Sequence, residues 1–104
     1  MNNKGKAETF IGFAIRTGNY RIGTNACQTL KKASLVIVCS SASDNTKKDA
    51  DKLARKFGCK IIETKEKTLE EYTHRENAKV MAIADKSLSK AILSNAEEDF
   101  IARN

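Results

Sequence analysis

A run of five apolar residues at positions 35–39, Leu-Val-Ile-Val-Cys, constrains the fold of this chain more than any other feature. Short apolar runs that are rich in β-branched residues are typical of strands buried on both faces. The run is far too short for a membrane-spanning helix, which needs about 20 apolar residues. A strand of this kind needs helices on both of its faces, so the run predicts a sheet enclosed between two helical layers.

Helix-type and strand-type patterns alternate on both sides of this run. The segments with strand character are residues 20–22, 35–39, 60–63 and 79–84. Apolar residues at helical spacing predict helices over residues 7–17, 24–32, 43–57, 68–74 and from Asp85 through Ile92. The acidic stretch 97–99 is expected to be a solvated tail, after which Phe100 and Ile101 fold back. The pattern predicts one α/β domain, residues 1–104, built as a three-layer α/β/α sandwich around a four-stranded mixed sheet.

Residues at the ends of the predicted helices support these boundaries. Gly18 and Gly58 follow the last apolar positions of two helices, where a residue in the left-handed conformation commonly ends a helix. Side chains that can cap a helix start stand before three others: Thr24 or Asn25, Ser43 or Asp44, and Asp85.

The three cysteines, Cys27, Cys39 and Cys59, argue against two classes of small protein. Their odd number and wide spacing are not those of a secreted disulfide scaffold or a zinc site, and His74 is the only histidine. Cys39 and Cys59 are therefore expected to be buried as small apolar residues, with no metal or other cofactor bound. No apolar signal segment follows the basic N-terminus, so the protein is expected to be cytoplasmic, without a membrane partner.

The chain offers no arrangement of residues that is typical of an enzyme. It contains neither a phosphate-binding P-loop nor a GxGxxG motif. Glu70 and Glu71 are adjacent, so on a helix they point about 100° apart and cannot act as an acid–base pair. These two carboxylates and His74 are interpreted as solvated side chains. We therefore expect no catalytic activity.

The basic excess of the chain is concentrated in its first third. The net charge is +6, yet the first 34 residues carry six basic side chains against one acidic one, whereas the rest carries 13 against 12. A one-sided basic surface is typical of proteins that bind polyanions. The alternative is an ordinary basic surface without a polyanionic partner.

The segment Gly-Thr-Asn at positions 23–25 is the best candidate for a binding site within this basic third. It stands at a predicted helix start, where unpaired backbone N–H groups can receive a phosphate. Glycine lets another backbone come close, and the Asn25 amide can contact a base edge. Arg21 precedes the segment, and Lys31 and Lys32 follow it. The alternative is an ordinary helix cap beside ordinary lysines.

Five pieces of the sequence, spread over about residues 8–95, stand in an order and at a spacing that a known family shares. They are residues 10–14 with Gly18, 22–25, 35–38, 42–48, and Leu69 with 80–85. On these pieces the chain resembles the kink-turn-binding ribosomal protein family (L-seven-Ae/L-thirty-e), most closely its small bacterial YlxQ-like members. The resemblance implies a ribosomal L-thirty-e-like fold. It also implies binding of kink-turn or similar structured RNA by a ribosomal or ribosome-associated protein, with other ribosomal proteins among its partners.

The resemblance also implies where the RNA is held. Members of the family grip RNA with the start of the second helix and with the loop before the last strand. On this chain the second region is the loop around residues 69–75. The predicted RNA-binding residues are Arg21, Gly23, Thr24, Asn25, Gln28, Lys31, Lys32, Leu69 and Arg75.

The chain departs from the family pattern in both of these regions. Ala26 stands where the family has a glutamate, and Gln28 or Thr29 stands where it has a lysine. In the later loop, Glu70 and His74 replace glycines, and Glu70 brings a negative charge toward the expected RNA. These departures motivate an alternative function: a protein-interaction module on the same fold that has lost RNA binding.

Overall fold

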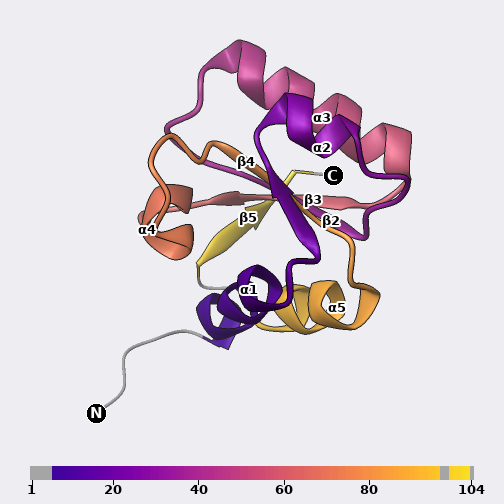
Figure 1. The fold of residues 1–104 in the computed structure, drawn as a ribbon. Helices are drawn as coiled ribbons and strands as arrows, with labels where there is room; N and C mark the ends of the chain where they lie inside the picture. The colour runs from indigo at the N-terminus through magenta and orange to yellow at the C-terminus, as the bar shows by residue number, and fades with distance from the viewer. Residues whose placement is uncertain (1–5, 97–98, 104) are drawn as a thin grey trace.

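The described part of the chain comprises residues 6–96 and 99–103 of a computed structural model (Figure 1). Its helices are α1 (Lys6–Thr17), α2 (Thr24–Gln28), α3 (Asp44–Phe57), α4 (Leu69–Thr73) and α5 (Lys86–Ser94). Its strands are β1 (Tyr20–Ile22), β2 (Leu35–Val38), β3 (Lys60–Thr64), β4 (Val80–Ile83) and β5 (Phe100–Ala102). Residues 97 and 98 of the predicted acidic tail, and Lys4 of the basic first third, lie outside the described residues.

The strands form one mixed sheet in the order β1-β4-β2-β3-β5. β2 and β3 are parallel, with Leu35 opposite Lys60, and the other neighbouring strands are antiparallel. Figure 1 shows α2 and α3 over one face of the sheet, α1 and α5 over the other, and α4 to one side. The predicted α/β arrangement, with helices on both faces of a mixed sheet, is confirmed.

The sheet has five strands, so the prediction of four was wrong. The additional strand, β5, runs antiparallel to β3 at the edge of the sheet. The backbone N–H of Arg103 extends this pairing by donating to the Ile61 carbonyl at 3.0 Å. The Arg103 guanidinium donates to the carboxylates of Asp51 and Glu63 at 2.6–2.9 Å. A three-residue strand with one buried side chain is too short to show a period of two, so only these tertiary contacts specify it.

The core is centred on β2 and β4, which are neighbours in the interior of the sheet. Every side chain of both strands is at most 1% exposed, because helices cover both faces. This confirms the prediction of a doubly buried strand in the run 35–39, although the strand itself ends at Val38 and the buried Cys39 follows it. Burial of this kind supplies the largest favourable contribution to folding of a small domain.

The cysteines are buried to different degrees. Cys27 and Cys39 are fully buried, and burial raises the pKa of the Cys27 thiol to about 11. The prediction is thus confirmed for Cys39, which follows β2 directly. It was wrong for Cys59, which is only partly buried because it lies between Gly58 and the start of β3, beside an opening in the surface.

Most of the predicted helix ends are confirmed by their hydrogen bonds. The Ser43 hydroxyl accepts from the Thr46 N–H (3.2 Å), and the Asp85 carboxylate accepts from the Leu88 N–H (2.9 Å). Gly58 ends α3 in the left-handed conformation, with φ 64°. These local signals are decisive because each acts within four residues along the chain.

The second helix is the exception, because it is five residues long rather than the predicted nine. It ends at Gln28, where the Thr29 hydroxyl donates to the Ala26 carbonyl at 2.6 Å. The N–H groups of Thr29 and Leu30 bond to carbonyls three residues back, which tightens the last turn. The chain must then cross to β2 within a few residues, so the helix cannot continue to residue 32. The predicted side-chain caps are also absent, and Gly23 occupies the cap position.

Candidate nucleic-acid interface

The pairing of β1 with β4 brings the start of α2 next to the loop that precedes β4. Ile22 lies opposite Met81, and the Gly23 N–H donates to the Val80 carbonyl at 2.8 Å. Segments that are more than fifty residues apart in the sequence therefore meet at one end of the sheet. The two regions named from the sequence as RNA-contacting, residues 23–25 and the loop after α4, are neighbours in the fold.

Gly23 starts α2 through its backbone rather than through a side chain. Its φ of 96° and ψ of 143° lie in a region that residues with a side chain rarely adopt. A Cβ added there would meet no atom within 4 Å, so the backbone angles require glycine and crowding does not. The Gly23 carbonyl accepts from the Cys27 N–H at 2.9 Å, which forms the first turn.

The side chains of Thr24 and Asn25 are left without a capping role. Neither makes a cap hydrogen bond to this helix. Asn25 is exposed, and its amide makes no hydrogen bond to the described residues. An asparagine amide offers both a donor and an acceptor, which is the combination that recognises a base edge. Asn25 is thus available to a ligand from outside the molecule.

Glu70 holds the loop between α4 and β4 in shape. Its carboxylate accepts from the Asn77 N–H at 2.8 Å and pairs with the Lys79 ammonium at 3.0 Å. The hydrogen bond from Lys79, followed by that from the Asn77 N–H, lowers the pKa of Glu70 below its ordinary value. Glu70 is thus accessible to solvent, as interpreted, but it also pairs with a neighbouring cation and bonds to the loop backbone.

Two residues of this loop adopt left-handed backbone angles without being glycine. They are His74, with φ 58°, and Asn77, with φ 60°. His74 ends α4, and its N–H donates to the Glu70 carbonyl at 2.8 Å. The chain thus makes this turn with a histidine, and the imidazole is exposed at the surface.

Glu71, which was also interpreted as solvated, has a local structural role as well. It forms a capping box with Thr68: the Glu71 carboxylate accepts from the Thr68 N–H at 3.0 Å, and the Thr68 hydroxyl accepts from the Glu71 N–H at 3.2 Å. The two adjacent glutamates therefore stabilise different features, Glu71 the start of α4 and Glu70 the loop that follows the helix.

Two arginines of the predicted set gather around Tyr20 on the edge strand β1. Arg75 donates to the Tyr20 hydroxyl at 2.8 Å, and its guanidinium carbon lies 5.7 Å from the centre of the tyrosine ring. Arg21 donates to the Tyr20 carbonyl at 2.7 Å. Both arginines are exposed, so their remaining N–H groups can reach phosphate oxygens. Tyr20 was not among the predicted site residues, although an aromatic residue next to a basic one is a signal that could have identified it.

Other members of the predicted set lie away from this end of the sheet. Gly23 is beside Val80, whereas the N–H of Ser34 donates to the Ile83 carbonyl at 2.8 Å. Val80 and Ile83 are three residues apart along β4, which corresponds to about 10 Å at ~3.4 Å per residue. Lys31 and Lys32 are exposed near the far end of that path. Gln28 is exposed at the end of α2, where its carbonyl accepts from Lys56 at 3.4 Å.

Leu69 does not belong to the interface. Its side chain is 0% exposed, and its backbone N–H donates to the Cys39 sulfur at 3.3 Å. The structure moves this residue from the predicted RNA contact into the core, because the first residue of α4 must cover the end of β2. The predicted loop contact is thereby reduced to the residues that follow α4, with Arg75 among them.

The described residues contain no group of three histidine, cysteine or acidic side chains that could hold a metal ion. No helix within residues 6–96 or 99–103 is long and apolar enough to cross a membrane.

The chain matches no protein-family model and no curated protein. It is similar to the solved structure of a protein with unknown function from Bacillus halodurans C, with a TM-score of 0.75 and 20% sequence identity. The likeness covers 91% of this chain and 100% of that chain. At this level of identity it shows that the two proteins share a fold over nearly their whole length.

Proposed function

We propose that this protein binds structured RNA, of the kink-turn or a similar internal-loop type, as a non-catalytic ribosomal or ribosome-associated protein. The observation that supports this most strongly is the contact between Gly23 and Val80, which sets residues 23–25 beside the loop before β4. These are the two regions with which the resembled family holds RNA. The loop with two left-handed residues and the helix start capped by glycine thus lie side by side at this end of the sheet.

The chemistry of the exposed groups fits an internal loop better than a regular duplex. An internal loop exposes base edges and unstacked bases, which protein side chains can hydrogen-bond and stack upon. Asn25 supplies the amide for a base edge, while Arg21 and Arg75 supply guanidinium groups for phosphates. Lys79 is already paired with Glu70, so the phosphate contacts rest mainly on the two arginines.

A binding assay with salt titration tests this proposal. The purified chain is titrated against a kink-turn RNA and a plain duplex of equal length, at several salt concentrations. We expect tighter binding to the kink-turn, together with an affinity that falls about tenfold between 50 and 200 mM salt if about two phosphates are neutralised. The absence of RNA binding at low salt would contradict the proposal and favour the protein-interaction module.

A further inference from the structure

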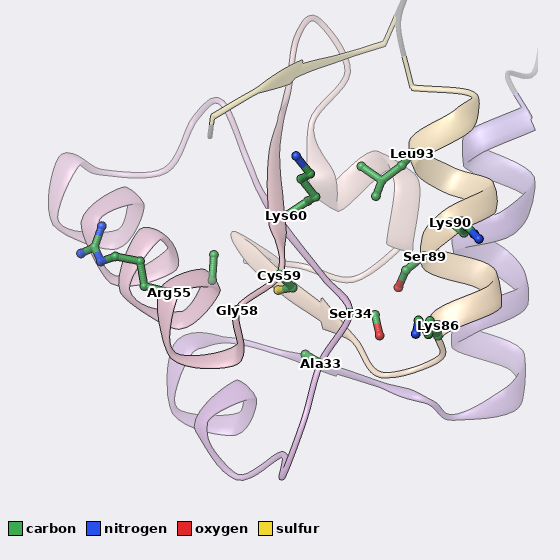
Figure 2. A pocket seen from close by; sticks show the side chains of 11 residues that line it. Ala33, Ser34, Arg55, Gly58, Cys59, Lys60, Lys86, Ser89, Lys90 and Leu93 are labelled. Atoms are coloured by element: carbon green, nitrogen blue, oxygen red, sulfur yellow. The ribbon is translucent and has the colours of Figure 1, made fainter.

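A cavity opens at the end of the sheet opposite to the candidate interface. Its volume is about 640 Å³, and it lies between the end of α3 and the exposed side of α5, where β2 and β3 begin (Figure 2). This volume is within the range of pockets that hold small molecules, about 300–1,000 Å³. Its apolar wall is formed by Ala33, Ala54, Cys59 and Leu93. The cavity is an open depression with room for part of a small organic ligand.

The polar rim of this cavity carries positive charge only. Arg55, Lys60, Lys86 and Lys90 line it, and none of the described lining residues is acidic. The ion pairs formed within residues 6–96 and 99–103 include none of the three lysines. Asp85 is next to Lys86 in the sequence, but its carboxylate caps α5 by accepting a hydrogen bond from the Leu88 N–H. The three lysines of the rim thus have no ion-paired carboxylate within residues 6–96 and 99–103, whereas Arg55 interacts electrostatically with Asp51.

The wall of the cavity contains a buried hydroxyl that has no hydrogen-bond partner among the described residues. Ser89 is 2% exposed, and its Oγ makes no hydrogen bond to any described residue. Figure 2 shows this hydroxyl directed from α5 toward the space near Ser34 and Lys86. Buried polar side-chain atoms nearly always have a hydrogen-bond partner in the protein or in ordered water, so the Ser89 hydroxyl is free to bond to a water or a ligand in the cavity.

We propose that the cavity binds a small organic phosphate. The phosphate accepts a hydrogen bond from the Ser89 hydroxyl and is neutralised by Lys86, with Lys60 and Lys90 at the rim, while the organic part contacts the apolar wall. Phosphate is favoured over a single carboxylate because it carries more charge to set against the lining lysines, of which Lys86 lies beside Ser89 in Figure 2, and lysine binds phosphate as a point charge. This site is separate from the proposed RNA interface, since β4 runs from one to the other.

Isothermal titration of the full chain with inorganic pyrophosphate, in a phosphate-free buffer at low ionic strength, tests the site. We expect saturable binding to one site, weakened about tenfold by Lys86→Ala, as for the loss of a charged hydrogen bond. Ser89→Ala should weaken binding severalfold while leaving every charge in place. Lys48→Ala, an exposed lysine of α3 outside the cavity, is the matched control and should change nothing.

Two results would overturn the proposal. Binding that does not saturate, or that Lys48→Ala weakens as much as Lys86→Ala does, would show attraction to overall charge without a site. Displacement of pyrophosphate by the kink-turn RNA would show that the cavity receives RNA phosphates rather than a small molecule. Lys86→Ala alters an exposed side chain, so it remains informative even if Ser89→Ala fails to fold. Neither result depends on whether RNA binds at the opposite end.

Discussion

The two ends of β4 differ in how their charged side chains are paired. At the Val80 end, charged groups are already engaged: Glu70 pairs with Lys79, and Arg75 bonds to Tyr20. At the Ile83 end, lysines line a cavity, and no carboxylate of the described residues forms an ion pair with them. The first end presents a shaped backbone with an exposed amide, which suits recognition of a large partner by form. The second end presents unbalanced charge in a hollow, which suits capture of a small anion.

This contrast teaches that charge counted along a sequence is not charge on a surface. The first third of the chain holds most of the net charge, yet its Lys31 and Lys32 lie away from Gly23. The unpaired cavity lysines come instead from residues 60–90, a part of the sequence that is nearly neutral overall. Folding has separated opposite charges that the sequence places together.

The largest expected effect is a loss of stability in the core, which supports both ends of β4. Ile37 is fully buried in β2, opposite Met81 of β4 and Ile62 of β3. Ile37→Ala should lower the free energy of unfolding by about 2–5 kcal/mol, because it leaves a cavity between the helical layers. Urea unfolding followed by circular dichroism measures the change. A loss below about 1 kcal/mol would show that the sheet centre is not closely packed, and that the two ends are not held by one core.

The next largest effect concerns the backbone at the Val80 end of β4 alone. Gly23→Ala should destabilise the chain by about 1–3 kcal/mol, because its φ of 96° is unfavourable for any residue with a Cβ. Gly12→Ala is the matched control: it lies in α1, its new Cβ would meet no atom within 4 Å, and it should stabilise by about 0.5–1 kcal/mol. Thermal unfolding of both variants checks the difference. Equal effects of the two substitutions would contradict the structural role given to Gly23.

At the same end, the contacts that discriminate between RNAs can be separated from those that bind phosphates. Asn25→Ala should reduce the preference for kink-turn RNA over duplex by about tenfold, the effect of losing a base-edge contact. Arg75→Ala should weaken binding to both RNAs and reduce the salt slope by about one. Binding isotherms at several salt concentrations distinguish the two. If both variants lose affinity in the same way, no base edge is being recognised by Asn25.

A smaller effect concerns the order of the loop before β4 as a function of pH. The ionised form of Glu70 binds Lys79 and the Asn77 N–H, and its pKa in the folded chain is lowered. Its contribution is therefore complete above the pKa of an unfolded glutamate, about 4.3, and is lost as the pH falls through the lower folded value. The protection factor of the Asn77 amide, which corrects for the slower intrinsic exchange at low pH, should fall over that range. Glu70→Gln should make this exchange fast at neutral pH.

Glu76→Gln is the control for the loop measurement, because Glu76 is exposed and makes no hydrogen bond to the described residues. It should leave amide exchange at Asn77 unchanged. An equal effect of Glu70→Gln and Glu76→Gln would show that net charge, and not the bond to the Asn77 N–H, orders the loop.

Features of the fold that depend on local sequence were predictable. The doubly buried strand within residues 35–39 and the caps made by Ser43, Asp85 and Gly58 were all confirmed, because each is specified within a few neighbouring residues. β5 was not predictable as a strand, since its place depends on pairing with β3 and on the contacts of Arg103. The early end of α2 is likewise imposed by the need to reach β2.

The candidate sites divide in the same way. The segment 23–25 could be identified because a glycine, a threonine and an asparagine stand together next to basic residues. Leu69 was misplaced because a residue adjacent to a loop in sequence can still point into the core. The cavity had no sequence signal at all, since its lining comes from three separate stretches, 33–34, 54–60 and 86–93.

The most direct test of this account is a titration of the ¹⁵N-labelled chain with kink-turn RNA, followed by amide chemical shifts. We predict that perturbations centre on Gly23, Asn25 and Asn77, at the Val80 end of β4, while the amides of Lys86 and Ser89 remain unchanged. Perturbations confined to the cavity, or a spectrum that does not change at any RNA concentration, would contradict the assignment of RNA to the end of the sheet where α2 begins.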